Sequence, residues 1–111
     1  MNADLKRSKA IDSALSNIDG DFIKALAEPA RIEIMKQLII LGASDVKTLA
    51  EKMPQDRSVI SRHLSFMEKA GILNASKEGR HVIYSVDGAG ALKKSEQLLE
   101  TIRSCVALGC C

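Results

Sequence analysis

Two short helical patterns separated by a three-residue break constrain the fold of this chain more than any other feature. Residues 45–53 and residues 57–71 each repeat their apolar positions at the spacing of a helix. The break between them is "PQD", in which Pro54 cannot continue a helix and Asp56 can cap the next one. Two short helices joined by a tight turn indicate a helix-turn-helix over residues 45–71.

Further elements are expected on both sides of this motif. A hairpin with Gly79 at its tip follows it, and Gly109 is the natural end of a last helix. The expected elements are helices over 3–16, 29–41, 45–53, 57–71 and 88–108 and a two-stranded wing over 72–86, with a shorter helix over 21–27 ahead of the one that Pro29 opens. The predicted fold is therefore mainly α with a small β-hairpin wing, a dimeric winged helix-turn-helix in the order α-α-α-α-β-β-α.

Residue types also predict local details of these helices. Ser44 or Asp45 is expected to cap the first helix of the motif. The helices over 3–16 and 88–108 carry apolar stripes that need a neighbour, which favours dimerisation through them. Inward stripes are expected at Ile32, Met35, Leu38 and Ile39 in the helix that Pro29 opens, and at Leu92, Ser95, Leu99, Ile102 and Val106 in the last helix.

Composition is that of a single globular domain spanning residues 1–111. Aromatic residues make up 3% of the chain, so the core must be aliphatic. The net charge of +2 is small, but residues 56–86 hold five Lys and Arg against three Asp and Glu. No run of about 18 apolar residues and no signal-peptide pattern is found, so a cytoplasmic protein without a membrane partner is expected.

The helix over 57–71 has one face that suits a DNA groove. Serines let a helix approach closely, arginines reach guanine edges or phosphates, and the wing tip is basic. A solvated amphipathic helix is the alternative interpretation, which the preceding helix and the basic wing make less favourable. His63 lies in the middle of the opposite, apolar arc, which indicates a structural residue. The polar arc consists of Arg57, Ser58, Ser61, Arg62 and Ser65.

Three segments of the chain resemble a known family. "ALAEPARIEIMKQLI", "SVISRHLSFMEKAGIL" and "KEGRHVIYSV", in this order and spacing, are similar to the winged helix-turn-helix repressors of the arsenic- and metal-sensing ArsR family. The resemblance covers residues 20–86 and implies a symmetric homodimer that binds a palindromic operator and is released by an inducer. The DNA contacts that it implies are Arg57, Ser58, Ser61 and Arg62 on the recognition helix and Lys77 and Arg80 in the wing.

All three cysteines of the chain lie within its last seven residues. Cys105 is near the end of the last helix, and Gly109 could turn Cys110 and Cys111 back toward it. Three soft thiolates match trivalent arsenic or antimony, whereas structural zinc usually takes four ligands. We therefore expect As(III) or Sb(III) to bind Cys105, Cys110 and Cys111 as the inducer, with no permanent cofactor.

Other interpretations of these thiols stay open. Oxidation of Cys105 with Cys110 or Cys111, as a disulfide or a polysulfide bridge, would make a redox-responsive or reactive-sulfur-responsive repressor. A plainer interpretation treats Cys105 as an apolar filler and the last two cysteines as a tail. The sulfur sensors of the family have one cysteine upstream, and no cysteine precedes Cys105 here.

The chain departs from the familiar metal sites of the family. The familiar arsenic site has paired cysteines at the start of the helix before the recognition helix, where this chain reads "GASDVKTLA". The familiar zinc site needs histidines on the last helix, and none follows His81. A thiol enzyme would need an activated nucleophile, and no Cys-x-x-Cys precedes a helix. We expect no catalytic residues and an arsenic site in a new place.

Overall fold

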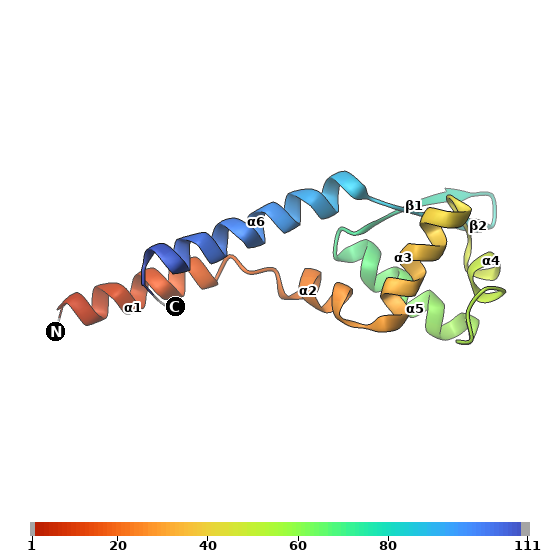
Figure 1. The fold of residues 1–111 in the computed structure, drawn as a ribbon. Helices are drawn as coiled ribbons and strands as arrows, with labels where there is room; N and C mark the ends of the chain where they lie inside the picture. The colour runs from red at the N-terminus through yellow and green to blue at the C-terminus, as the bar shows by residue number, and fades with distance from the viewer. Residues whose placement is uncertain (1, 110–111) are drawn as a thin grey trace. The chain divides into compact units, whose positions relative to one another are not determined.

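The structure, a computed structural model, describes residues 2–109. Within them the elements are α1 (Asn2–Leu15), α2 (Gly20–Ala27), α3 (Pro29–Leu41), α4 (Val46–Ala50), α5 (Arg57–Lys69), β1 (Leu73–Glu78), β2 (His81–Val86) and α6 (Gly88–Ala107) (Figure 1). The predicted mainly helical fold with a two-stranded wing is confirmed. Within the described residues five helices precede the wing, one more than the expected order α-α-α-α-β-β-α contains, because the short helix α2 lies between α1 and α3 as a helix of its own. No described helix is long and apolar enough to cross a membrane.

The chain forms two compact units, and residues 21–91 make up the larger one. Within it, α2 and α3 are separate helices because of Pro29. Glu28 has extended backbone angles, φ −97° and ψ 133°, which a residue before proline prefers, and Pro29 occupies the first turn of α3. Gly42 ends α3 with a φ of +81°, a value that glycine adopts without strain.

The helix-turn-helix consists of α4 and α5, and both helices are shorter than expected. The sequence predicts the first helix to residue 53, but α4 ends at Ala50 with Glu51 as its C-cap residue, ahead of the break at Pro54. The second helix ends at Lys69, and Gly71 follows with a φ of +85°. Asp45 is the N-cap of α4, as one of the two expected candidates.

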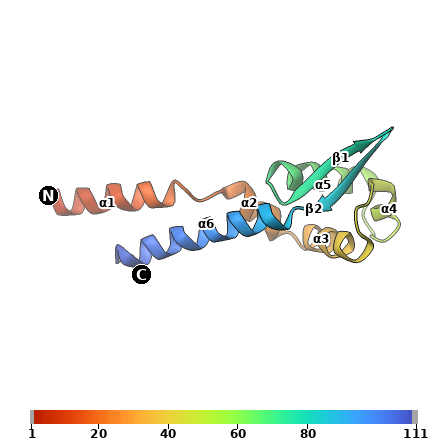
Figure 2. The same ribbon diagram turned by 90° about the horizontal axis from the view of Figure 1, so that it is seen from above.

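The wing is an antiparallel hairpin in which Leu73 pairs with Val86 and Glu78 pairs with His81 (Figure 2). Gly79 and Arg80 form the two-residue turn between the strands. Gly79 has a φ of +61°, as the first central position of such a turn requires. The strands begin one residue later than the expected wing, at Leu73.

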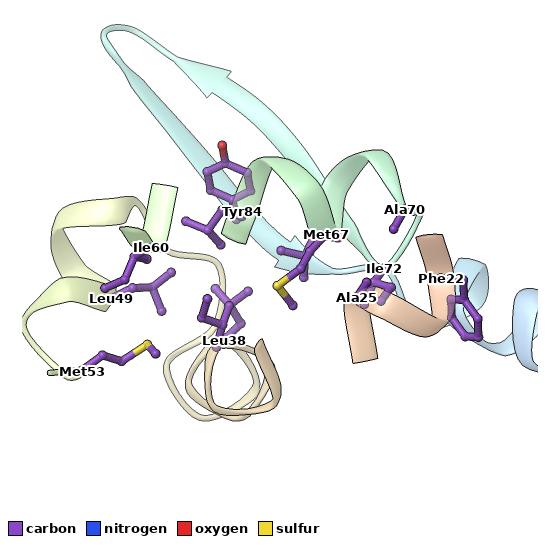
Figure 3. Close-up of a cluster of buried hydrophobic side chains, with 13 residues drawn as sticks. Phe22, Ala25, Leu38, Leu49, Met53, Ile60, Met67, Ala70, Ile72 and Tyr84 are labelled. Carbon is purple, nitrogen blue, oxygen red and sulfur yellow. The ribbon is translucent and has the colours of Figure 1, made fainter. Parts of the chain in front are cut away.

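The core of the larger unit lies where α3, α4, α5 and the wing converge (Figure 3). Its side chains are mostly aliphatic, as the low aromatic content predicts, and Phe22 and Tyr84 are its aromatic members. The largest of its fully buried side chains are those of Ile34, Leu49, Ile60, Leu64, Met67 and Ile72. Three of these belong to α5, so the recognition helix is anchored through one face.

The expected stripe of α3 is partly wrong. Leu38 is buried and Met35 packs against the core, but Ile32 and Ile39 are 50% and 69% exposed. Ile34, which the stripe omitted, is fully buried. Apolar residues surround α3 on nearly every side, so helical spacing alone could not identify the inward face.

The smaller unit contains α1 and the part of α6 from Leu92 onward, which run alongside each other in opposite directions (Figure 2). The Arg7 guanidinium donates to the carbonyl of Gly109 at 2.6 Å, and Lys94 pairs with Asp19 at 2.5 Å. Thr101 and Cys105 are the buried residues of α6.

The expected apolar stripe of α6 is left uncovered by the other described residues, 2–109. Its large members, Leu92, Leu99, Ile102 and Val106, are all about half exposed, and on α1 Leu5 and Leu15 are exposed as well. Gly109 follows α6 with a φ of +76°, so the predicted end of this helix is confirmed.

The two isoleucines Ile34 and Ile39 provide a matched test of the inward face of α3. Ile34→Ala should lower the free energy of unfolding by about 2–5 kcal/mol, because it leaves a cavity in the core. Ile39→Ala should change it by less than about 0.5 kcal/mol, because the side chain is exposed. Urea unfolding followed by circular dichroism measures both. A larger loss for Ile39→Ala would contradict this assignment.

Candidate nucleic-acid interface

The recognition helix α5 has two faces with different roles. Ile60, Leu64 and Met67 are buried and fasten the helix to the core. The residues that the sequence proposes as DNA contacts lie elsewhere on the helix. Arg57, Ser58 and Arg62 are exposed and Ser61 is half-buried. The core contacts therefore leave the small and basic side chains accessible to a partner.

The N-terminal end of α5 leaves backbone donors available. Asp56 is the N-cap residue, as predicted, with extended angles of φ −67° and ψ 154°, but its side chain makes no capping hydrogen bond. The first N–H groups of a helix have no partner within the helix. Such donors, together with the positive end of the helix dipole, attract anionic groups such as a phosphate.

The wing is attached to the helix-turn-helix by backbone hydrogen bonds that sequence reasoning missed. The Ser44 N–H donates to the Tyr84 carbonyl at 2.9 Å, and the Tyr84 N–H donates to the Ser44 carbonyl at 2.8 Å. Both residues are buried. Ser44 is thus a bridge residue and not the cap of α4, a role that no local pattern distinguishes. The bridge holds the start of α4 beside β2.

This bridge creates a small basic hollow between α4, the first residue of α5 and the wing. Its volume is about 180 Å³, and its lining residues are Asp45, Val46, Lys47, Arg57, Arg80, His81 and Val82. Three cationic side chains and one carboxylate therefore face the same space. Arg57 of α5 and Arg80 of the wing, both predicted DNA contacts, line this hollow together. Lys47 lines it as well and was not predicted as a DNA contact. Lys77 is exposed on β1 outside the hollow.

The carboxylate of Asp45 contacts neighbouring residues through both of its oxygens. Its Oδ1 accepts hydrogen bonds from the backbone N–H of Thr48 at 2.9 Å and from the Thr48 hydroxyl at 2.7 Å. Its Oδ2 lies 3.4 Å from Nδ1 of His81 in the wing. The backbone hydrogen bond from Thr48 lowers the pKa of Asp45 most, followed by the hydrogen bond from the Thr48 hydroxyl. Burial raises this pKa by less than either hydrogen bond lowers it, and the charges of His81 and Lys47 lower it a little further.

The candidate thiol site is described only in part. Cys105 is buried, with 8% of its surface exposed, and Cys110 and Cys111 lie outside the described residues. Within residues 2–109, no three His, Cys, Asp or Glu side chains gather closely enough to hold a metal ion. The three-cysteine arrangement thus stays a prediction.

Comparison with known protein families matches residues 28–75 to the family described as "Bacterial regulatory protein, arsR family". An uncharacterized HTH-type transcriptional regulator of Mycobacterium tuberculosis, Rv0081, is 32% identical over 72 residues, which are 65% of this chain and 63% of the relative. The chain therefore spans slightly less than two thirds of that relative's length.

Solved structures show the same likeness. A structure described as a possible transcriptional regulator for arsenical resistance has a TM-score of 0.62 and 34% identity, covering 74% of this chain and 83% of that one. The cadmium metal-sensor CMTR of Mycobacterium tuberculosis has a TM-score of 0.53 and 34% identity, covering 68% of this chain and 78% of that one.

The charge of Asp45 should make stability depend on pH. The pKa of Asp45 in the folded protein lies below the ordinary aspartate value of 3.8, so the stabilisation is complete above about pH 3.8 and is lost as pH falls through the folded pKa. Asp45→Asn keeps a cap without the charge, and should be about 0.5–1 kcal/mol less stable at pH 7. Urea unfolding at pH 7, 5, 3 and 2 should show this difference shrinking below pH 3.8.

Thr48→Val is the matched control for this pH dependence. It removes the hydroxyl donor and keeps the backbone N–H, so in this background Asp45→Asn should cost less at pH 7. A difference between the wild-type chain and Asp45→Asn that stays constant down to pH 2 would contradict the assignment.

Proposed function

The chain belongs to the ArsR family of bacterial regulatory proteins, and from this premise we propose that it is a repressor released from DNA by trivalent arsenic or antimony. Members of this family are DNA-binding transcriptional regulators and not enzymes. The observation that carries the DNA-binding part is the surface shared by α5 and the wing. There, Arg57 and Arg80 face one basic hollow, beside the start of α5, where the side chain of the N-cap residue makes no capping hydrogen bond.

On DNA, α5 would lie in the major groove. Arg57, Ser58, Ser61 and Arg62 would contact base edges and neighbouring phosphates, with the serines allowing close approach. The hollow beside α5 would receive a backbone phosphate between Lys47, Arg57 and Arg80. Lys77, exposed on the wing, would contact the backbone farther along. The exposure of these side chains supports this arrangement.

A homodimer would present two such surfaces to a palindromic operator. The half-exposed apolar side chains of α6, at Leu92, Leu99, Ile102 and Val106, support this proposal because no other part of the described chain covers them. A second copy would bury them, as the size of the chain also favours. Two recognition helices would then meet half-sites about one DNA turn apart.

The inducer would bind through Cys105, Cys110 and Cys111. Three thiolates suit the pyramidal coordination of As(III) or Sb(III), and no permanent cofactor is needed. The similarity to a cadmium metal-sensor supports a thiophilic inducer. Because all three cysteines would be needed, the site is incomplete without the last two residues of the chain. The protein would act in the cytoplasm, where thiols stay reduced.

Release would follow from the burial of Cys105. A ligand that draws this sulfur toward Cys110 and Cys111 must expose or re-pack the end of α6, because only 8% of Cys105 is accessible. Arg7 of α1 donates to the Gly109 carbonyl, so this change also reaches α1. A coupling of about 1–3 kcal/mol would weaken DNA binding about 5- to 150-fold.

The DNA contacts can be tested with two arginines of different roles. Arg62→Ala should weaken operator binding about 5- to 150-fold and relax base preference, because a base contact is lost. Arg80→Ala should weaken operator and random DNA alike and lower the slope of log affinity against log salt by about 1. Arg103→Ala removes an equal charge from α6, where Arg103 is 67% exposed, and should change neither. Fluorescence anisotropy at several salt concentrations measures all three.

The inducer can be tested on the same reduced protein, bound to DNA from upstream of its own gene. Stoichiometric arsenite should release it, and changing Cys105, Cys110 or Cys111 to Ser should abolish release. Zinc and cadmium serve as comparisons. Persistent binding under arsenite would contradict the metalloid proposal. Release by oxidants alone would instead support the redox-responsive alternative with the same cysteines.

A further inference from the structure

One arginine connects three helices of the larger unit through its side chain. Arg31, in the first turn of α3, donates from Nε to Nδ1 of His63 on α5 at 3.1 Å and from Nη1 to the Lys24 carbonyl of α2 at 2.5 Å. Its guanidinium also lies 4.4 Å from the centre of the Phe66 ring. Only 16% of the Arg31 side chain and 16% of the His63 side chain are exposed.

This contact assigns Nδ1 of His63 as a hydrogen-bond acceptor. Arginine always carries the Nε proton, so Nδ1 of His63 must offer its lone pair and the ring proton must be on Nε2. A proton on Nδ1 would leave Arg31 without this acceptor. Its acceptor would then be Glu28, whose Oε2 lies 3.5 Å from Nδ1 and 3.4 Å from Nε of Arg31. In the observed geometry Nδ1 of His63 is thus the acceptor for Arg31, and the Glu28 carboxylate lies beside both groups.

The contact between Arg31 and His63 lies on the helix proposed to enter the DNA groove. Ile60, Leu64 and Met67 bury one face of α5 through apolar contacts, and such contacts have no preferred direction of their own. A hydrogen bond requires one donor direction and one acceptor atom. His63 and Phe66 are one turn apart on α5, so Arg31 contacts the helix at two successive points beside the buried row.

We infer that Arg31 is a positioning residue for DNA binding, which fixes the rotation of the recognition helix through its hydrogen bond to Nδ1 of His63 and its contact with the Phe66 ring. The inference rests on the proposed use of α5 for reading DNA. Base contacts depend on placing side chains within about 0.5 Å, so losing this restraint should reduce sequence-specific binding. Non-specific binding depends on the number of phosphate contacts and should be unaffected.

The first measurement is spectroscopic. Nitrogen-15-labelled protein should show a scalar coupling across the N–H···N hydrogen bond from Arg31 Nε to His63 Nδ1, with Nδ1 unprotonated. The coupling should disappear in Arg31→Lys, which keeps the charge but has no donor at this place. Arg103→Lys makes the same chemical change on α6 and should leave the coupling intact. Its absence from the wild-type spectrum would overturn the inference.

The second measurement is affinity for a duplex that the wild-type chain selects from a random-sequence pool. Arg31→Lys should bind it about tenfold more weakly, which corresponds to about 1.4 kcal/mol, while binding to random DNA and its salt dependence stay unchanged. His63→Leu should lose a similar factor. His63→Asn keeps an acceptor at the δ position and should remain within about threefold of the wild-type affinity.

The outcomes separate this inference from the proposed function. Failure of the wild-type chain to select any sequence would overturn the proposed DNA reading and this inference with it. Intact wild-type selection with unchanged affinity for Arg31→Lys and His63→Leu would overturn the inference alone. The comparison of His63→Leu with His63→Asn tests the inference even if the Arg31 variants fail to fold. Equal losses for His63→Leu and His63→Asn would also count against it.

Discussion

The two backbone hydrogen bonds between Ser44 and Tyr84 are the interaction on which the candidate DNA surface depends. They join the residue before the cap of α4 to the middle of β2. As a result, Asp45 comes within 3.4 Å of His81, and Lys47, Arg57 and Arg80 face one hollow. Because backbone groups make the bridge, it does not depend on the identity of the side chains on the wing. The basic character of the surface thus arises from placement, since the net charge of the chain is only +2.

Two kinds of contact, apolar packing and a directional hydrogen bond, hold the recognition helix α5 in place. Ile60 and Leu64 remove apolar surface from water and set how closely α5 approaches the core. Arg31 adds a contact with a defined direction, and its second bond ends on a carbonyl of α2. Placing a charged group at only 16% exposure is costly unless its donors find partners. Here the side chain has His63, Lys24 and Glu28 around it.

Much of the fold could be predicted from the sequence, because its signals are local. Pro54 and Gly79 mark the two turns, and the change from helical to alternating spacing marks the wing. The exposed face of α5 could also be predicted, since its polar and apolar residues separate clearly. The inward face of α3 could not, because apolar residues surround that helix. The bridging role of Ser44 and the contacts of Arg31 could not be predicted, because their partners lie 40 and 32 residues away, beyond any periodic pattern. The role of the cysteines stays a prediction.

Burial of Cys105 also has a kinetic consequence. A thiol with 8% exposure can react with a reagent only while the surrounding turn is open, so opening sets the fastest rate of reaction. Cys105 lies two residues from the end of α6, and terminal turns open at the lowest free energy in a protein. The hydrogen bond from Arg7 to the Gly109 carbonyl holds the residue just beyond this turn against α1. The response time of this thiol is thus set by the end of a helix, independently of how tightly any reagent binds afterwards.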